Sequence, residues 1–344
     1  MRVKTFLHRS ADEPTTLAEI LRICAEVGLG EFIGVFAYAT QSGVASFDLA
    51  VGEEFWNRTP TRWLFGIDYG RTHPDALRRI CGKANTEIRI VDGSWVLESP
   101  GFVPRRDFHA KMSIVSNPAS ARFGMVVGSG NFSSNGLRRS LEAGATVIVE
   151  GQDAYAAAFE RSVSTVNELW DDATAIEEIV DDYEERWHDC FGSEIVEVGL
   201  DVDEDRDVQF WIEAGYVTRN RGPERPGNQI DLPRGMGRYF GLAYPQNLQR
   251  NSVIGEITFD TPTGDLVTRS LRFGNNSMEK ITLPIPETHG FDLYDGKVLV
   301  FRRSGNGFKI QALEPEDFDK SFGKRLDQVR EMGSGRLYGR IDEQ

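Results

Sequence analysis

The chain has 344 residues, of which 40% are hydrophobic, 39 are Lys or Arg and 53 are Asp or Glu. This length is enough for two domains, each with its own core. The longest apolar run, Phe32 to Ala39, is too short to span a bilayer, and no signal-peptide pattern opens the sequence. We therefore expect a cytoplasmic protein with no membrane partner. Cys24, Cys81 and Cys190 are widely spaced, which predicts core thiols and excludes a disulfide framework or a Cys-based zinc site.

The excess of acid lies in one segment. Residues 1–150 carry 17 basic and 16 acidic side chains, residues 206–344 carry 20 and 19, and residues 151–205 carry 2 and 18. A segment of this kind is usually a solvated helical linker. A second hypothesis is a polyanion that folds back onto a basic groove until an anionic partner displaces it.

Short strands and helices alternate in the first half of the chain. Apolar runs bounded by turn residues predict buried strands at 32–38, 62–68, 87–91, 111–115 and 124–127. Helices are predicted from Leu17 to Val27, opened by Thr15 or Thr16, and from Pro74 to Cys81. An amphipathic helix at 153–170 and an acidic helix at about 174–190 follow. This alternation indicates an α/β sandwich, a mixed sheet flanked by helices.

The second half contains strands that are separated by Gly and Pro. They are predicted at 208–212, 253–259, 266–273, 280–283, 296–302 and 308–313, which indicates a mostly β domain, a barrel or pseudobarrel. The polar, Gly-rich tail from Ser321 is expected to be a flexible arm. We place the first domain at 1–170, the acidic helical linker at 171–205 and the β domain at 206–344.

The residues that suggest chemistry lie between positions 108 and 144. His109 and Lys111 are two residues apart, so on a strand their side chains point to the same face. After the next strand, Gly128-Ser129-Gly130-Asn131 combines glycines, which allow close backbone approach to an anion, with two polar side chains. Glu142 follows eleven residues after Asn131. These groups suit an oxyanion or a phosphoryl group.

Each of these residues has an ordinary structural explanation when it is taken alone. A lone histidine is more often structural than catalytic, and Gly-Ser-Gly-Asn is a common turn. The order of the three elements along the chain, His-x-Lys, then Gly-Ser-x-Asn, then Glu, is what favours a site over coincidence.

With these motifs in this order, residues 20–150 resemble the phospholipase D superfamily, whose pattern is His-x-Lys, an Asp five residues after the Lys, and Gly-Ser-x-Asn. The sequence departs from that pattern at position 116, which is Ser. A missing Asp with a later Glu resembles the nuclease branch, in particular metal-independent restriction endonucleases of the BfiI and NgoFVII type. Members of that branch add a C-terminal DNA-binding pseudobarrel related to the plant B-three class, and the predicted layout is similar.

The resemblance implies a role for each motif residue. His109 would attack phosphorus and form a covalent phosphohistidine. Lys111 and Asn131 would hold the non-bridging oxygens. Glu142 would take the role left vacant at Ser116, accepting a hydrogen bond from the far ring nitrogen of His109, and Ser129 would add a hydroxyl to the phosphate or to this network.

A second histidine must protonate the leaving oxygen and later activate water. The remaining histidines, none of which has Lys two residues on, are His8, His73, His188 and His289. We therefore predict a homodimer in which two copies of the motif form one shared site. No divalent-metal signature lies near the motif, so no cofactor is predicted and activity is expected in chelator.

Arginine and amide side chains of the second half suit a DNA partner. The first cluster lies in a Gly/Pro-rich region and contains Arg219, Asn220, Arg221, Arg225, Asn228, Gln229, Arg234, Arg238, Tyr239 and Arg250, and a second contains Arg269, Arg272, Asn275 and Asn276. For any one arginine, solvation of the outer face of the β domain is an equally good explanation. Together they favour sequence-specific binding of double-stranded DNA.

The sequence thus predicts a metal-independent, sequence-specific restriction endonuclease. If DNA is the partner, the acidic segment is either a linker or a phosphate mimic in the nuclease groove. Two other functions stay open, a phospholipase D-like lipid phosphodiesterase and a noncatalytic DNA-binding regulator with a degenerate site. A requirement for an ATP-dependent partner subunit is also open, since the chain has no P-loop.

Overall fold

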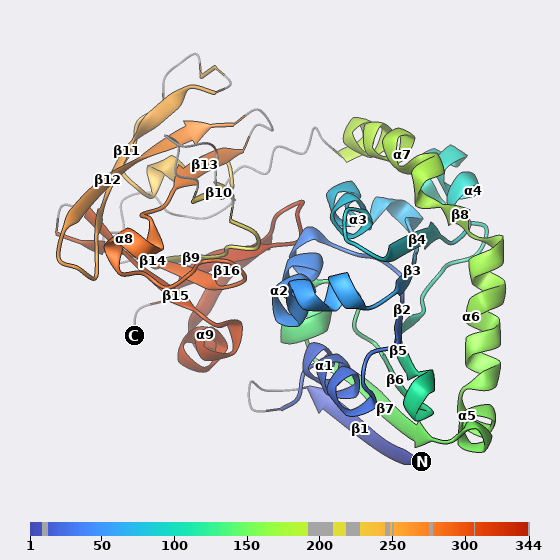
Figure 1. Cartoon of the computed structure of the whole chain (residues 1–344). Coiled ribbons are helices and arrows are strands. Elements are labelled where there is room, and N and C mark those ends of the chain that lie inside the picture. Colours follow the sequence, from blue (N-terminus) through green and yellow to red (C-terminus); the bar gives the residue numbers. More distant parts are fainter. Residues whose placement is uncertain are drawn as a thin grey trace. The chain divides into compact units, whose positions relative to one another are not determined.

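The chain forms two compact units, Met1–Ser193 and Glu194–Gln344 (Figure 1). The computed structural model describes residues 1–8, 13–191, 209–217, 228–244, 248–249, 251–274, 278–305 and 307–342.

An eight-stranded mixed sheet is the centre of the first unit, with strand order β1-β7-β6-β5-β2-β3-β4-β8. Neighbours among β2, β3 and β4 are parallel, and the other neighbours are antiparallel. The strands are β1 (Arg2–His8), β2 (Glu31–Phe36), β3 (Thr61–Phe65), β4 (Thr86–Ile90), β5 (Lys111–Asn117), β6 (Arg122–Gly128), β7 (Glu142–Glu150) and β8 (Thr174–Ala175). All five predicted strands are present, whereas β1, β7 and β8 were not predicted.

Helices cover both faces of this sheet, with α1 and α2 on one side and α5 and α6 on the other (Figure 1). They are α1 (Thr16–Val27), α2 (Gln41–Arg58), α3 (Pro74–Cys81), α4 (Gly93–Glu98), α5 (Gln152–Ala158), α6 (Glu160–Asp172) and α7 (Ile176–Phe191). The predicted start of α1 is confirmed, because the Thr15 side chain accepts a hydrogen bond from the Ala18 amide at 3.0 Å. The single helix predicted at 153–170 is wrong: the backbone leaves helical geometry at Phe159, with φ of −120°, and the buried ring of Phe159 marks the break.

Aromatic side chains fill the core between the sheet and α2. The ring of Phe132, which follows the Gly-Ser-Gly-Asn turn, lies 5.0 Å from that of Phe36, 5.4 Å from Phe47 and 5.1 Å from Trp63. Offset and tilted aromatic pairs of this kind add about 0.5–1.5 kcal/mol each beyond their buried area. The turn that carries Ser129 and Asn131 is therefore anchored by a core residue directly after it.

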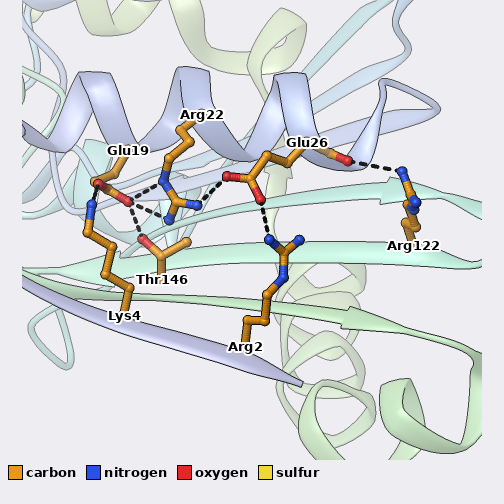
Figure 2. A network of polar contacts seen from close by, with 7 residues as sticks. All are labelled: Arg2, Lys4, Glu19, Arg22, Glu26, Arg122 and Thr146. Atoms are coloured by element: carbon orange, nitrogen blue, oxygen red, sulfur yellow. Dashed lines mark hydrogen bonds and ion pairs between the residues drawn. The ribbon is translucent and has the colours of Figure 1, made fainter.

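A polar network fastens α1 to the edge of the sheet (Figure 2). The carboxylate of Glu19 is 1% exposed and accepts hydrogen bonds from Lys4 at 2.7 Å, Arg22 at 2.7 and 2.9 Å and Thr146 at 2.8 Å. Burial by itself would raise the pKa of Glu19, but the hydrogen bonds from Arg22, Lys4 and Thr146 lower it below its usual range. Because Lys4 lies on β1 and Thr146 on β7, one buried charge fixes the edge strand β1 and its neighbour β7 against the helix.

A nine-stranded sheet forms most of the second unit, with order β10-β13-β12-β11-β15-β14-β9-β17-β16. Its strands are β9 (Gln209–Glu213), β10 (Gln229–Leu232), β11 (Val253–Asp260), β12 (Leu266–Phe273), β13 (Glu279–Thr282), β14 (Val298–Ser304), β15 (Gly307–Leu313), β16 (Leu326–Glu331) and β17 (Leu337–Ile341), with short helices α8 (Pro286–His289) and α9 (Pro315–Phe322). The mostly β character is confirmed. Within the described residues no ladder joins β10 to β16, so the sheet is open and the pseudobarrel stays a prediction.

Two expectations from the sequence need correction. The tail from Ser321 is not a flexible arm, because β17 pairs with β9 and places Tyr338 and Ile341 in buried positions. Of the three cysteines only Cys24 is buried, which raises its pKa to about 12, whereas Cys190 is exposed. No helix within the described part of the chain is long and apolar enough to cross a membrane.

Candidate phosphodiesterase site

His109 and Lys111 lie together, as predicted, where the chain enters β5. The Lys111 ammonium is 3.1 Å from Nδ1 of His109 and donates to the His109 carbonyl at 2.7 Å. Strand β5 begins only at Lys111, which pairs with Phe36 of β2, so His109 lies just before the strand rather than on it. The imidazole of His109 is exposed and accessible to a substrate.

The charge of Lys111 is influenced by two other side chains. Partial burial lowers the pKa of Lys111, the positive charge of Arg71 lowers it further, and the carboxylate of Glu142 opposes both. The ammonium is thus incompletely neutralised within the protein, and a substrate anion would stabilise it.

The Gly128–Asn131 turn ends β6 beside the start of β7. A Cβ at Gly128 would lie 2.7 Å from the Ala143 carbonyl oxygen, and one at Gly130 would lie 2.2 Å from that of Gly136. Both glycines are therefore required by backbone packing, independently of any anion.

Ser129 and Glu142 are joined by a hydrogen bond in which the Ser129 hydroxyl donates to the carboxylate. The Ser129 amide also donates to the Ala143 carbonyl at 2.9 Å, so the contact is part of the β6–β7 connection. No hydrogen bond joins Glu142 to His109 within the described residues. Glu142 thus lies at the motif, but its carboxylate binds Ser129. The predicted hydrogen bond from the His109 ring to Glu142 stays a prediction.

The side chain of Asn131 has no hydrogen-bond partner for its buried Oδ1 in the part of the chain that the structure describes. Buried amides are normally paired, and unpaired ones call for an explanation. A π-helical turn, Asn135–Arg139, follows directly, and such turns occur often at functional sites. Because Oδ1 only accepts, its partner must be a donor, whereas an incoming oxyanion would be bound by the amide hydrogens on Nδ2 of the same side chain.

A second histidine, His8, lies next to this group, which sequence reasoning missed. His8 is opposite Glu142 in the β1–β7 ladder, and its Nδ1 lies 3.0 Å from the Ser140 carbonyl oxygen. Since a carbonyl oxygen only accepts, Nδ1 carries the proton. No signal for this strand is readable in the sequence because β1 is an edge strand whose residues are mostly exposed and include no continuous apolar run.

The segment at residues 66–73 is also fastened to the motif. Asp68, which is 8% exposed, accepts a hydrogen bond from the Phe108 amide at 2.9 Å, directly before His109. Tyr69 donates its hydroxyl proton to Asp107 at 2.8 Å. Burial raises the pKa of Asp68, and the nearby carboxylates of Asp107 and Asp92 add to this effect. These contacts set the direction in which the chain enters His109.

The acidic helix α7 packs on α3. Arg78 of α3 forms ion pairs with Asp181 at 2.6 Å and Glu184 at 2.5 Å. Tyr183 and Trp187 donate hydrogen bonds to the carbonyls of Thr72 and Gly70 at 2.6 and 2.7 Å. Within the described residues no acidic side chain of α7 contacts the His109 motif. The acidic cluster at 201–205 lies outside the described residues.

Seven of the residues in the two predicted DNA-binding clusters are described in the second unit: Asn228, Gln229, Arg234, Arg238, Tyr239, Arg269 and Arg272. Arg238 and Arg272 are exposed, and Arg234 is half-buried with its guanidinium 5.4 Å from the centre of the Phe273 ring. The residues that lie outside the described part are Arg219, Asn220, Arg221, Arg225, Arg250, Asn275 and Asn276.

Among the other four, Tyr239 and Asn228 are buried, whereas Gln229 and Arg269 are half-buried. Tyr239 is buried and donates to the Phe301 carbonyl at 2.8 Å. Asn228 is also buried, Gln229 donates to Thr282 at 2.9 Å, and Arg269 is part-buried at 3.2 Å from His289. The expectation that Tyr239 and Asn228 contact DNA is corrected accordingly, because both are buried, whereas that for Gln229 and Arg269 stays a prediction.

A buried carboxylate shapes the loop that presents Arg234 and Arg238. Glu279 is 0% exposed and accepts hydrogen bonds from the amides of Gly235 and Gly237 at 2.6 and 2.8 Å and from the Tyr244 hydroxyl at 2.6 Å. Three donors on one carboxylate hold the loop in a single conformation. Sequence reasoning missed this residue because its partners lie 35 to 44 positions away.

No group of three or more His, Cys, Asp or Glu side chains suited to a metal ion occurs within the described residues. A cavity of about 460 Å³ between α1 and α2 is lined by none of the predicted site residues. The motif instead lies at an open end of the sheet, where β5 and β7 begin and β6 ends.

The sequence matches no protein-family model and no curated protein. Among solved structures, NucT from Helicobacter pylori is similar with a TM-score of 0.36 and 11% identity over 51% of this chain and 98% of NucT. A phospholipase D family member, Nuc from Salmonella typhimurium, gives a TM-score of 0.34 and 13% identity over 51% of this chain and 97% of Nuc. Yeast tyrosyl-DNA phosphodiesterase gives 0.31 and 14% identity over 55% of this chain and 41% of that protein.

Proposed function

We propose that this protein is a metal-independent DNA endonuclease of the phospholipase D type, which acts as a restriction enzyme in the cytoplasm through a covalent phosphohistidine. The observation that carries the proposal is the exposed imidazole of His109 at 3.1 Å from the Lys111 ammonium. Ser129, Asn131 and Glu142 lie at the same end of the sheet, since antiparallel neighbours bring the start of β5 and β7 to the end of β6.

The chemistry proceeds as two displacements at phosphorus. In the first, an imidazole nitrogen of His109 bonds to phosphorus, the bond from phosphorus to the leaving oxygen breaks, and an acid gives that oxygen a proton. In the second, water attacks phosphorus, a base takes its proton and the N–P bond breaks, which restores His109. Lys111 and Asn131 hold the non-bridging oxygens in both steps.

The contacts of the free protein suggest how a substrate prepares the nucleophile. An ammonium only donates, so Nδ1 of His109 accepts from Lys111 while no substrate is bound. A phosphate that draws Lys111 away frees Nδ1 to carry the proton and leaves Nε2 as the attacking nitrogen. Glu142 accepts a hydrogen bond from Ser129 in the free protein. We assign Glu142 as the carboxylate that stabilises this tautomer by accepting from Nδ1 of His109.

The acid and base for the leaving group and water are assigned to His109 of the partner subunit in a homodimer. The described residues hold one His-x-Lys pair, and a two-fold axis would bring a second copy to the same phosphate. Sedimentation of the active enzyme tests this assignment. An active monomer at working concentration would contradict it.

The second unit is proposed to read double-stranded DNA. Exposed Arg238 and Arg272, with Arg234 on the loop that Glu279 holds, supply cations for phosphates and base edges. Asn275 and Asn276 of the second cluster would add further contacts to DNA. Arg219, Arg221 and Arg225 of the first cluster would do the same. Charge reversal at Arg234 plus Arg238 should weaken DNA binding and lower its salt slope.

The decisive experiment incubates the wild type and His109→Ala with a large, sequence-diverse DNA in excess EDTA, beside vesicles of phosphatidylcholine. Discrete DNA fragments from the wild type alone are expected, and their ends give the recognition site. Hydrolysis of phosphatidylcholine without DNA cleavage would assign the lipid phosphodiesterase function instead. DNA cleavage in a parallel reaction with Mg²⁺ that is lost in EDTA would reject the metal-independent mechanism, whereas DNA binding without cleavage in either reaction would favour a missing ATP-dependent partner subunit or a noncatalytic regulator.

A further inference from the structure

The loop at residues 66–73 exposes two side chains beside the His109 motif. Tyr69 is 41% exposed and Arg71 is exposed, whereas the residues on either side, from Gly66 to Asp68 and at Gly70 and Thr72, are buried. The loop thus buries most of its residues and exposes the aromatic ring of Tyr69 and the guanidinium of Arg71, which are available to a ligand.

The loop is held rigidly from several directions. Thr72 donates its hydroxyl proton to the Gly66 carbonyl at 2.5 Å and accepts from the Ala39 amide at 3.2 Å. Helix α7 contributes the Tyr183 and Trp187 hydrogen bonds to Thr72 and Gly70 described above. The conformation is thus fixed before any ligand binds, which lowers the entropy cost of binding.

The backbone at the tip is strained. Tyr69 has φ of +57° and Gly70 has φ of +67°, and the left-handed region is unfavourable for a residue with a Cβ. Strain of this kind persists only where the surroundings impose it, and it concentrates at functional sites. Here it points the Tyr69 hydroxyl to Asp107 and places the Arg71 guanidinium 5.5 Å from the centre of the Tyr69 ring.

Arg71 has no carboxylate within ion-pair distance in the described part of the chain. Its charge nevertheless acts on Lys111. Two cations that repel each other, one at the reacting group and one on a rigid neighbouring loop, lower their energy when two anions bind beside them.

We propose that Arg71, held by the Tyr69 ring, binds the phosphate next to the one that His109 attacks. This inference rests on the proposed nuclease function and makes the substrate class a polynucleotide strand, which carries a phosphate at every step. A lipid diester or a small diester has one phosphate and offers Arg71 nothing. Lys111 and Asn131 already suffice for the oxygens of the scissile group, so Arg71 is a substrate-positioning residue.

The test compares Arg71→Ala with Arg58→Ala in the whole chain. Arg58→Ala also removes one exposed positive charge. Arg58 lies at the C-terminal end of α2, whereas the motif packs beside the N-terminal end of that helix, at Gly43. Binding of a fluorescent single-stranded oligonucleotide is measured by anisotropy over a range of NaCl concentrations. Cleavage of DNA and of bis-p-nitrophenyl phosphate, a diester with one phosphate, is measured in parallel.

Arg71→Ala is expected to weaken oligonucleotide binding about fivefold to tenfold and to reduce the salt slope by about 0.7, the value for one phosphate of a single strand. The ratio of DNA cleavage to small-diester cleavage should fall by about tenfold. Tyr69→Phe, which keeps the ring but removes the bond to Asp107, should give a smaller loss of the same kind. Arg58→Ala should leave both measurements as in the wild type.

Other outcomes separate this inference from the proposed function. If the wild type cleaves neither substrate while Arg71→Ala still weakens binding and lowers the salt slope, the catalytic proposal fails and the phosphate contact stands. Unchanged binding and an unchanged ratio would overturn the inference. An equal loss on both substrates would also overturn it, because Arg71 would then act on the scissile phosphate or on the shape of the site.

Discussion

His8 lies directly opposite Glu142 in the antiparallel ladder of β1 and β7, and its Nδ1 donates to the Ser140 carbonyl at 3.0 Å, two residues before that glutamate. Directly opposed residues have their side chains on the same face of a sheet. The buried imidazole thus fixes the chain where Glu142 enters the site. The network around Glu19 in turn fixes β1, because Lys4 of the same strand is bound there.

Replacement of His8 tests this positioning role. His8→Leu removes the donor to Ser140 and should lower stability by about 1–3 kcal/mol. It should also reduce kcat about tenfold with a smaller change in KM, since His8 is buried and acts through the position of Glu142. His8→Asn is the matched control, because an amide nitrogen can replace Nδ1 as donor, and it should recover most of the activity. Equal kcat in all three proteins would exclude the positioning role.

Lys111 should set the alkaline limit of activity. Its pKa lies below the ordinary value of 10.5, first because of desolvation and then because of Arg71. The charged form binds phosphate, so kcat/KM should fall as pH rises through the lowered pKa. In Lys111→Arg the guanidinium stays charged, so the alkaline fall should be flatter although the maximum is lower. The measurement is kcat/KM from neutral pH to about pH 11, and an identical alkaline limb in both proteins would assign it to another group.

His73 should make the first unit sensitive to mild acid. Burial lowers the pKa of His73 to about 4; Asp75 and Glu184 act in the opposite direction and His188 in the same one. The unfolded chain binds the proton near pH 6.5. The contribution of neutral His73 to the free energy of unfolding is therefore fully present above about pH 6.5. It is lost as pH falls towards about 4, and the loss is at most about 3 kcal/mol.

His73→Asn provides the comparison for this effect. His73 caps α3 by accepting from the Asp75 amide at 3.2 Å, and Asn is a good residue at such a position but does not titrate. Urea unfolding at neutral pH and near pH 5 should show a smaller acid loss in the variant. The same loss in both proteins would place the acid sensitivity elsewhere.

Glu279 should decide the order of the loop that presents Arg234 and Arg238. Glu279→Ala leaves two amides and a hydroxyl without their buried acceptor, so we expect a loss of about 2–4 kcal/mol and weaker DNA binding. Tyr244→Phe removes one of the three donors and should have a milder effect. Hydrogen exchange at Gly235 and Gly237 measures the loop directly. Unchanged protection in Glu279→Ala would show that other contacts hold it.

Several elements of the fold were predictable because their causes are local. The apolar runs of β2 to β6 and the Thr15 cap of α1 depend on neighbours within a few residues. Elements with weak local signals were missed. β1 exposes most of its residues, and β16 and β17 lie in a polar, Gly-rich tail in which β17 pairs with β9, far away in the sequence, and β16 pairs with β17.

The sequence by itself determined the order of His109, Lys111, Ser129, Asn131 and Glu142, and this order is the basis of the phosphoryl chemistry that we propose, since residue types and their spacing decide which groups can act on a phosphate. Only the tertiary structure decided that His8 lies opposite Glu142, that Glu142 bonds to Ser129, and that Tyr69, which carries Arg71 on its ring, bonds to Asp107. The physical reason is that these contacts join residues far apart in the chain. Their partners are chosen by strand pairing and by the packing of a strained loop, and neither is encoded in any short stretch of residues.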